Sequence, residues 1–157
     1  MRQITVIGSG SDISKEVWDM AEELGRGIAK RGAVLICGGK GGVMEAVCKG
    51  AKQEGGLTVG ILPGTADEAN RYVDIRIVTE MGDARNAINV KSGDSIIVVC
   101  GGAGTLSEIG MALKARKKVI ALKSSGGVAS LLADAIIDGQ KIISANSVEE
   151  ALNLAFL

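Results

Sequence analysis

A glutamate follows a glycine-rich loop at a spacing that could place its carboxylate beside a bound phosphate. The segment VVCGGAGTLSEIG spans residues 98–110, and Glu108 comes about one helical turn after the threonine. Glycine lets the backbone approach an anion closely, and the free N–H groups at the start of a helix point towards such an anion. We therefore predict a phosphate site in this loop. The residues expected to bind the phosphate are Gly101, Gly102, Gly104 and Thr105.

Two further glycine-rich segments, GSGSDIS at residues 8–14 and CGGKGGVME at residues 37–45, also follow short apolar runs. Neither fits a common nucleotide fingerprint, because Ile13 stands where a dinucleotide motif has its third glycine and no segment matches the P-loop pattern. Tight strand-to-helix turns would explain one such loop, whereas three at one edge of a sheet favour a shared ligand. The residues expected to contact it are Gly8, Ser9, Gly10, Gly38, Gly39 and Gly42.

The T-x-x-E spacing of Thr105 and Glu108 is also the spacing of a helix capping box. Ser147 and Glu150 have the same spacing with no glycine loop before them. A cap and a ligand role can coexist, so both interpretations of Glu108 stay open.

Arg85, Asn86 and Asn89 occupy one short helical pattern after Asp83. Asn is a weak helix former, so two Asn residues this close together indicate a polar face with a role beyond helix stability. A solvated helix face is the alternative.

Short β-branched runs alternate with longer helical patterns along the whole chain. The continuous apolar run SIIVVC is typical of a strand buried on both faces, and the alternation implies right-handed crossovers. We expect one domain over residues 1–157, with a doubly wound, mostly parallel sheet of about seven strands and helices on both faces. In such a Rossmann-like α/β fold the ligand sits at the carboxyl ends of the strands, near the reversal of strand order. The predicted strands are 4–8, 33–37, 57–62, 75–78, 95–99, 118–121 and 141–143, and the predicted helices are 14–31, 43–54, 83–92, 105–116, 127–137 and 148–156.

Composition argues against several classes of protein. The 157 residues include no His, which removes Ser-His-Asp and Cys-His catalysis, and three Cys without C-x-x-C spacing argue against a metal site. Lys+Arg and Asp+Glu are equal at 18 each with no basic stripe, so we expect no nucleic-acid partner. No apolar run is long enough to span a bilayer, and the first residues lack signal-peptide features, so we expect a cytoplasmic protein without a membrane partner.

Two of the cysteines, Cys37 and Cys100, follow predicted strands. We expect them at neighbouring strand ends as small buried thiols, and we expect Cys48 to pack within a helix.

The third loop resembles the P-G-G-x-G-T-x-x-E signature of the LONELY GUY (LOG) family, long filed under "possible lysine decarboxylase". The segment MGDARN resembles that family's M-x-x-R-K element, with Arg85 fifteen residues before Cys100. The resemblance covers nearly the whole chain in order. The second loop resembles the family's G-G-G-x-x-G-[LV]-M through Gly38, Gly39, Gly42, Val43 and Met44.

Several residues depart from the LOG pattern. Cys100 replaces the signature proline, Cys37 replaces a glycine, Asn86 replaces the lysine, and Glu45 stands where many members have glycine. This variant is similar to a side branch of the family that includes molybdenum-cofactor carrier proteins.

The resemblance implies a site for a small phosphorylated ligand in a homodimer or larger homo-oligomer, with no cofactor required. In LOG hydrolases the matching arginine and glutamate are the catalytic pair, so Arg85 and Glu108 would hydrolyse the N-glycosidic bond of a nucleoside 5′-monophosphate, with Asn86 also contacting the ligand. Glycoside hydrolysis usually employs two carboxylates, and Glu45 is the second candidate.

The alternative is a non-enzymatic carrier or sensor of a nucleotide or of molybdenum cofactor. Glu45 favours this branch, because it adds charge and bulk where the hydrolases keep glycine. A pyridoxal-phosphate lysine decarboxylase is the weakest interpretation, because Lys40 is the only lysine in the glycine loops and glycines flank it.

Overall fold

Seven parallel strands form one sheet in the computed structural model, which describes residues 1–157. The strand order is β4-β3-β2-β1-β5-β6-β9, which confirms the predicted doubly wound, Rossmann-like sheet. The chain moves outward from β1 to β4 and then returns to the other side of β1 as β5, so the strand order reverses between β1 and β5. The strands are β1 (Gln3–Gly8), β2 (Val34–Cys37), β3 (Thr58–Leu62), β4 (Ile75–Val78), β5 (Ser95–Val99), β6 (Lys118–Leu122) and β9 (Ile143–Ala145).

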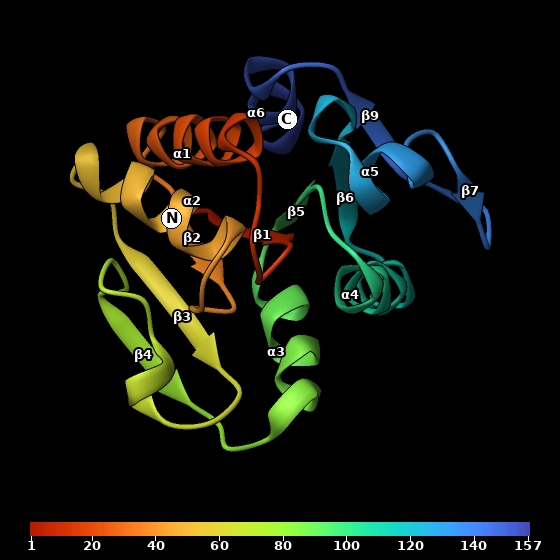
Figure 1. The fold of residues 1–157 in the computed structure, drawn as a ribbon. Coiled ribbons are helices and arrows are strands. Elements are labelled where there is room, and N and C mark those ends of the chain that lie inside the picture. The colour runs from red at the N-terminus through yellow and green to blue at the C-terminus, as the bar shows by residue number, and fades with distance from the viewer.

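Helices cover both faces of this sheet (Figure 1). Alternate residues of a strand point to opposite faces, and β5 shows why its apolar run is continuous. Ile97 and Val99 pack in the core under α1, α2 and α6, whereas Ile96 and Val98 pack in the core under α3, α4 and α5. The helices are α1 (Lys15–Lys30), α2 (Val43–Gln53), α3 (Arg85–Ser92), α4 (Ala103–Lys114), α5 (Gly127–Leu132) and α6 (Val148–Ala155).

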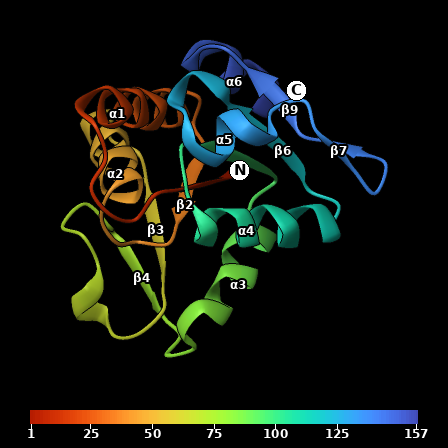
Figure 2. The same ribbon diagram turned by 45° about the vertical axis from the view of Figure 1, so that its right-hand side comes forward.

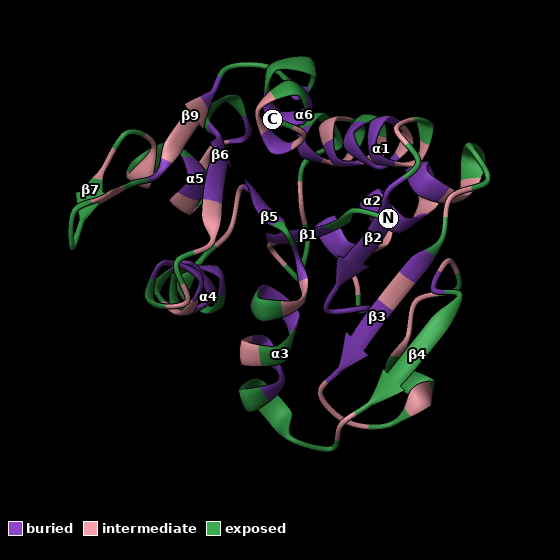
Figure 3. Ribbon diagram, turned by 180° about the vertical axis from the view of Figure 1, so that it is seen from behind, coloured by how far each residue is buried: buried purple, intermediate pink, exposed green.

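The centre of the sheet is buried and one edge is exposed (Figure 3). All residues of β5 are buried, whereas all four residues of the edge strand β4 are exposed. The reversal of strand order therefore lies in the buried part of the molecule. None of the helices is both long and apolar enough to cross a membrane.

The segment after α5 differs from the prediction. The predicted helix 127–137 ends at Leu132, and β7 (Ile136–Ile137) pairs with β8 (Gln140–Lys141) in an antiparallel hairpin. Asp138 and Gly139 form its turn, both with positive φ, as the tight hairpin turns of Asp-Gly pairs require. The last strand of the sheet consequently begins two residues later than predicted, at Ile143.

Candidate ligand site at the reversal of strand order

A cavity of about 290 Å³ opens beyond the carboxyl ends of β1, β2 and β5. All three glycine loops leave the sheet here, and the loop after β1 lies between the other two because β1 lies between β2 and β5. Segments far apart in the sequence thus share one wall, as expected where strand order reverses. The predicted site residues that line the cavity are Gly8, Ser9, Gly10, Gly38, Arg85, Asn86, Gly102, Gly104, Thr105 and Glu108.

Helix α4 starts at this cavity, and its first backbone N–H groups have no acceptor in the protein. Gly102 is the N-cap, and the first helical hydrogen bond runs from Leu106 N to Gly102 O at 2.9 Å. The N–H groups of residues 102–105 therefore remain free beside the cavity. Free donors and the positive end of a helix dipole favour a bound anion. Helix α4 packs against α3, which supplies the arginine of the site (Figure 2).

Gly102 and Gly104 are glycines that folding does not require. A Cβ atom at either position would meet no other atom within 4 Å. Neither residue has a positive φ. The bare backbone therefore leaves room for a group from outside the chain, which is the arrangement that a phosphate contact needs.

Three of the predicted glycines shape the loops and do not line the cavity. Gly39 packs on Leu62, whose Cδ2 would lie 2.7 Å from an added Cβ. Gly42 has a φ of 62°, and an added Cβ would overlap the Ser9 carbonyl. Gly101 donates its N–H to Ser9 Oγ at 3.1 Å, which joins the first loop to the third.

Arg85 is the only basic side chain in the cavity wall. Its guanidinium lies over Gly38, where an added Cβ would be 2.7 Å from Nη1 and 2.8 Å from Nη2. Nη1 donates to Asn86 Oδ1, and Nε is buried without a hydrogen-bond partner. Arg85, Asn86 and Asn89 are all buried, so the solvated-face interpretation is wrong.

The capping-box interpretation is also wrong for Glu108. Thr105 lies inside α4, and no side chain caps the start of this helix. At the equivalent spacing, Ser147 Oγ does accept a hydrogen bond from Glu150 N at 3.1 Å and caps α6. Helix capping therefore gives no reason for a carboxyl group at position 108.

Glu108 is a buried carboxyl in the cavity wall, with 7% of its surface exposed. Burial raises the pKa of this carboxyl from 4.5 to about 7, although a hydrogen bond from Asn89 and the positive charge of Arg85 both favour the ionised form. Asn89 Nδ2 donates to Glu108 Oε2 at 3.2 Å. A carboxyl with a pKa near neutrality in a cavity is a candidate functional group.

The wall also contains residues that were not among the predicted site residues. Among them, Asn89 has a side-chain amide that can bind a ligand. Its position four residues after Arg85, on the same face of a helix, was the sequence feature that could have identified it as a site residue. The others are Val6, Ile7, Ser11 and Met44.

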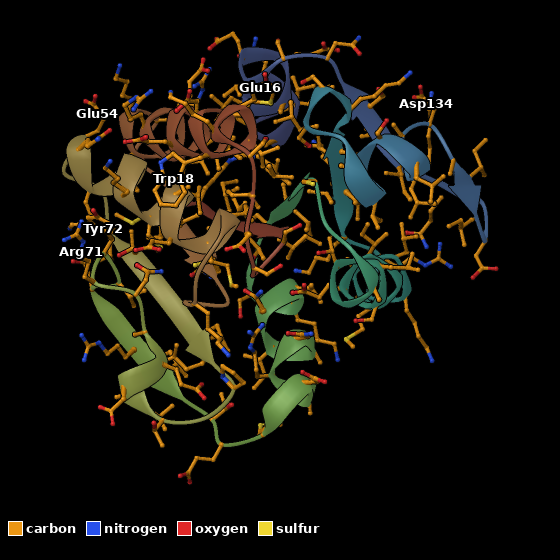
Figure 4. The ribbon with its side chains drawn as sticks, in the orientation of Figure 1. Glu16, Trp18, Glu54, Arg71, Tyr72 and Asp134 are labelled. Atoms are coloured by element: carbon orange, nitrogen blue, oxygen red, sulfur yellow. The ribbon has the colours of Figure 1, made fainter.

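Glu45 lies outside this cavity. It lines a neighbouring hollow of about 470 Å³ with Asp12 and Trp18, and the two hollows share Gly10 and Ser11. Trp18 projects from α1 towards α2 (Figure 4), where Lys49 Nζ lies 6.0 Å from the ring centre. Glu108 is the only carboxylate in the wall of the cavity at the start of α4. Lys40 is exposed and lines neither hollow.

Cys37 is buried and Cys48 packs within α2, as predicted, whereas Cys100 is only half-buried and the predicted neighbourhood of Cys37 and Cys100 is wrong. Cys37 and Cys100 do not lie at neighbouring strand ends, because β1 separates β2 from β5. Cys37 Sγ instead lies 3.5 Å from Cys48 Sγ. Cys100 has a φ of 54° and donates its N–H to Ser125 Oγ at 2.7 Å. Proline has neither this φ nor an N–H, so this loop backbone is incompatible with the LOG-signature proline.

Comparison with known proteins agrees with this fold. The model of the SLOG cluster4 family matches residues 1–152, and the chain belongs to this family. The molybdenum cofactor binding protein of Rippkaea orientalis is 40% identical, with a TM-score of 0.88 over 98% of this chain and 94% of that one. The molybdenum cofactor carrier protein of Chlamydomonas reinhardtii is 38% identical, also with a TM-score of 0.88, over 99% of this chain and 97% of that one.

The match to LOG enzymes is more distant and partial. Cytokinin riboside 5′-monophosphate phosphoribohydrolase of Mycobacterium tuberculosis is 36% identical over 68% of this chain and 59% of the enzyme. The chain therefore has a LOG-like, nucleotide-binding type of fold and is similar over nearly its whole length to molybdenum cofactor carrier proteins.

Proposed function

We propose that the protein is a carrier or sensor that binds a small phosphorylated ligand, either a nucleotide or molybdenum cofactor. The observation that carries this proposal is the start of α4, where free N–H groups and two unobstructed glycines face a cavity that contains a single arginine. One arginine and one helix N-terminus suit one phosphate monoester. The similarity to molybdenum cofactor carrier proteins over nearly the whole chain supports the proposal.

The same residues of this chain would hold either molybdenum cofactor or a nucleotide. The phosphate would lie at residues 102–105 with Arg85, whose buried Nε lacks an acceptor that a phosphate oxygen could supply. The neighbouring hollow beside Trp18 and Glu45 would provide space for the remaining part of a ligand larger than a phosphate. The ligand is cargo in this proposal, so the residues bind and release it without breaking a bond.

Hydrolysis of a nucleoside 5′-monophosphate is the second candidate, and the state of Glu108 favours it. A carboxyl with a pKa of about 7 beside an arginine can exchange a proton near neutral pH, which general acid–base chemistry requires. The cavity holds only this one carboxylate, whereas glycoside hydrolysis usually employs two. The catalytic pair of LOG hydrolases also contains a single carboxylate, so the preference for the carrier rests on the similarity to molybdenum cofactor carrier proteins over nearly the whole chain.

Two assays on purified protein separate these functions. Molybdenum content and oxidised-pterin fluorescence test for the cofactor, and release of free base from a panel of nucleoside 5′-monophosphates tests for hydrolysis. The carrier predicts a bound phosphorylated compound and no base release over many turnovers. Catalytic base release that falls about a hundredfold or more in Glu108→Gln, with binding retained, would overturn the carrier proposal in favour of the hydrolase.

A further inference from the structure

The side-chain amide of Asn89 has one paired end and one unpaired end. Nδ2 donates to Glu108 Oε2 at 3.2 Å, whereas Oδ1 is buried and has no hydrogen-bond partner. Asn89 is 1% exposed and lines the cavity. Buried polar atoms in folded proteins nearly always have a partner, so an unpaired acceptor in a cavity wall indicates a missing donor.

The orientation of this amide follows from its hydrogen bond to Glu108. The structure has the amide nitrogen donating to Glu108, the arrangement that an ionised, accept-only carboxylate requires, and the amide oxygen then has no donor. The backbone fixes this position, because Asn89 O accepts a hydrogen bond from Thr5 Oγ1 of β1 at 2.9 Å. The backbone of Asn89 is therefore held against β1, and its side-chain amide bonds only to Glu108, without a donor for its oxygen.

A second unpaired atom lies one helical turn earlier on the same face of α3. Arg85 Nε is a buried donor without an acceptor, whereas Asn89 Oδ1 is a buried acceptor without a donor. One ligand that carries both a phosphate and a hydrogen-bond donor would satisfy both atoms. A phosphate alone would satisfy Arg85 and leave Asn89 unpaired.

We infer that Asn89 determines ligand specificity: its amide oxygen accepts a hydrogen bond from a hydroxyl or N–H group of the phosphorylated ligand, while its amide nitrogen positions the Glu108 carboxylate. The inference rests on the proposed function for the ligand itself. The hydroxyl groups of a ribose and the N–H groups of a pterin are two sources of the same donor chemistry. Ligands without a donor at this point should be rejected, because they leave a buried acceptor unpaired.

The first test needs no ligand and therefore does not depend on the proposed function. Asn89→Leu removes both ends of the amide at similar volume, and carbon-13 NMR of the labelled carboxyl groups follows the titration of Glu108. We expect the pKa of Glu108 to move upward from about 7, because the lost hydrogen bond favoured the ionised form. We also expect the variant to melt no lower than wild type at pH 6, because Leu replaces a side chain whose oxygen is unpaired.

An unchanged Glu108 titration would overturn the positioning role. A lower melting temperature together with an unchanged Glu108 titration would indicate that Asn89 is a structural residue only. If Asn89→Leu fails to fold, Asn89→Asp serves instead, because a second carboxyl beside Glu108 must raise the pKa of the pair if the two side chains are in contact.

The second test compares ligands with and without the donor by calorimetry. The probes are AMP, 2′-deoxy-AMP, 3′-deoxy-AMP and neopterin monophosphate. We expect wild type to bind at least one donor-bearing probe about tenfold or more tightly than a deoxy analogue, and we expect Asn89→Leu to lose most of this preference. Equal preference in wild type and Asn89→Leu would overturn the specificity role. Absence of binding by any probe would reject the ligand half of the inference together with the proposed function, while the NMR titration still decides the contact with Glu108.

Discussion

Glu108 occupies a position where an ionisable side chain lowers stability near neutral pH. It lies in the second turn of α4, caps nothing, and receives one hydrogen bond, from Asn89. Burial without a paired charge raises the pKa of a carboxyl, and the value of about 7 shows that two favourable partners only partly offset this effect. Such a residue is expected at a functional site, where stability is commonly lower than a purely structural choice would allow.

This gives a residue-scale prediction for Glu108→Gln. The native state keeps the proton between pH 4.5 and about 7, whereas the unfolded state releases it, so the stability of wild type falls as pH rises through this window. Glutamine does not ionise. The free energy of unfolding of Glu108→Gln relative to wild type should therefore increase by roughly 3 kcal/mol from pH 4 to pH 8.

Urea denaturation of both proteins at a series of pH values measures this difference. A difference that stays constant with pH would mean that the Glu108 carboxyl titrates in the folded protein as it does in the unfolded chain.

The sequence allowed the glycine loops, Arg85 and Glu108 to be predicted because motif spacing identifies them directly. It did not indicate what each glycine does. Gly38 makes room for the Arg85 guanidinium, a contact between residues far apart in the sequence that depends on how α3 approaches β2. Asn89 shared a helix face with Arg85, but its unpaired oxygen is visible only in three dimensions.

At the scale of elements, α1 and α2 approach each other closely through glycines. A Cβ at Gly50 of α2 would overlap the carbonyl oxygen of Glu22 in α1, and a Cβ at Gly25 of α1 would overlap the carbonyl oxygen of Val47 in α2. The two helices follow the first two glycine loops, so their packing fixes how those loops meet. Val43 N, at the start of α2, donates to Ser9 O of the first loop at 2.9 Å.

Gly50→Ala should therefore destabilise the protein by about 1–3 kcal/mol, because backbone atoms cannot move aside as a flexible side chain can. The matched control is Gly110→Ala in the middle of α4, where an added Cβ meets nothing within 4 Å. Alanine there should increase the free energy of unfolding by up to about 1 kcal/mol through helix propensity. Chemical denaturation compares the two variants, and equal effects would contradict the close approach of α1 and α2.

Element positions were predictable where periodicity was long and clear, and less so where the chain turns tightly. The helical pattern after Gly127 continued in sequence through Ala133–Ile137, yet the structure places a hairpin there. The Asp138–Gly139 pair was the local signal of a tight turn, and it outweighs the apolar spacing before it.

At the scale of the whole molecule, strand order decides which loops meet. The sequence predicted a doubly wound sheet, but local patterns do not specify that β1 lies between β2 and β5. For this reason the prediction that Cys37 and Cys100 lie at neighbouring strand ends was wrong. The three glycine loops nevertheless meet at one cavity, at the carboxyl ends of the strands where open parallel sheets bind ligands.

The resemblance to LOG proteins also leads us to propose a homo-oligomer. Multi-angle light scattering should give a mass of at least twice the 16.0 kDa of the chain. A single species at the mass of one chain across a wide range of protein concentrations would contradict this proposal.

The central claim is that a phosphorylated ligand sits on the backbone at the start of α4. Gly104→Val and Gly110→Val are a matched pair, because both replace an unobstructed glycine of α4 but only Gly104 lines the cavity. The measurement is mass spectrometry of the small molecules released from wild type and both variants, purified in parallel. We predict that wild type and Gly110→Val carry the same phosphorylated compound at similar occupancy, and that Gly104→Val loses it by about tenfold or more, because a side chain blocks close approach of the phosphate. Retention of the compound by Gly104→Val at wild-type occupancy would contradict the claim.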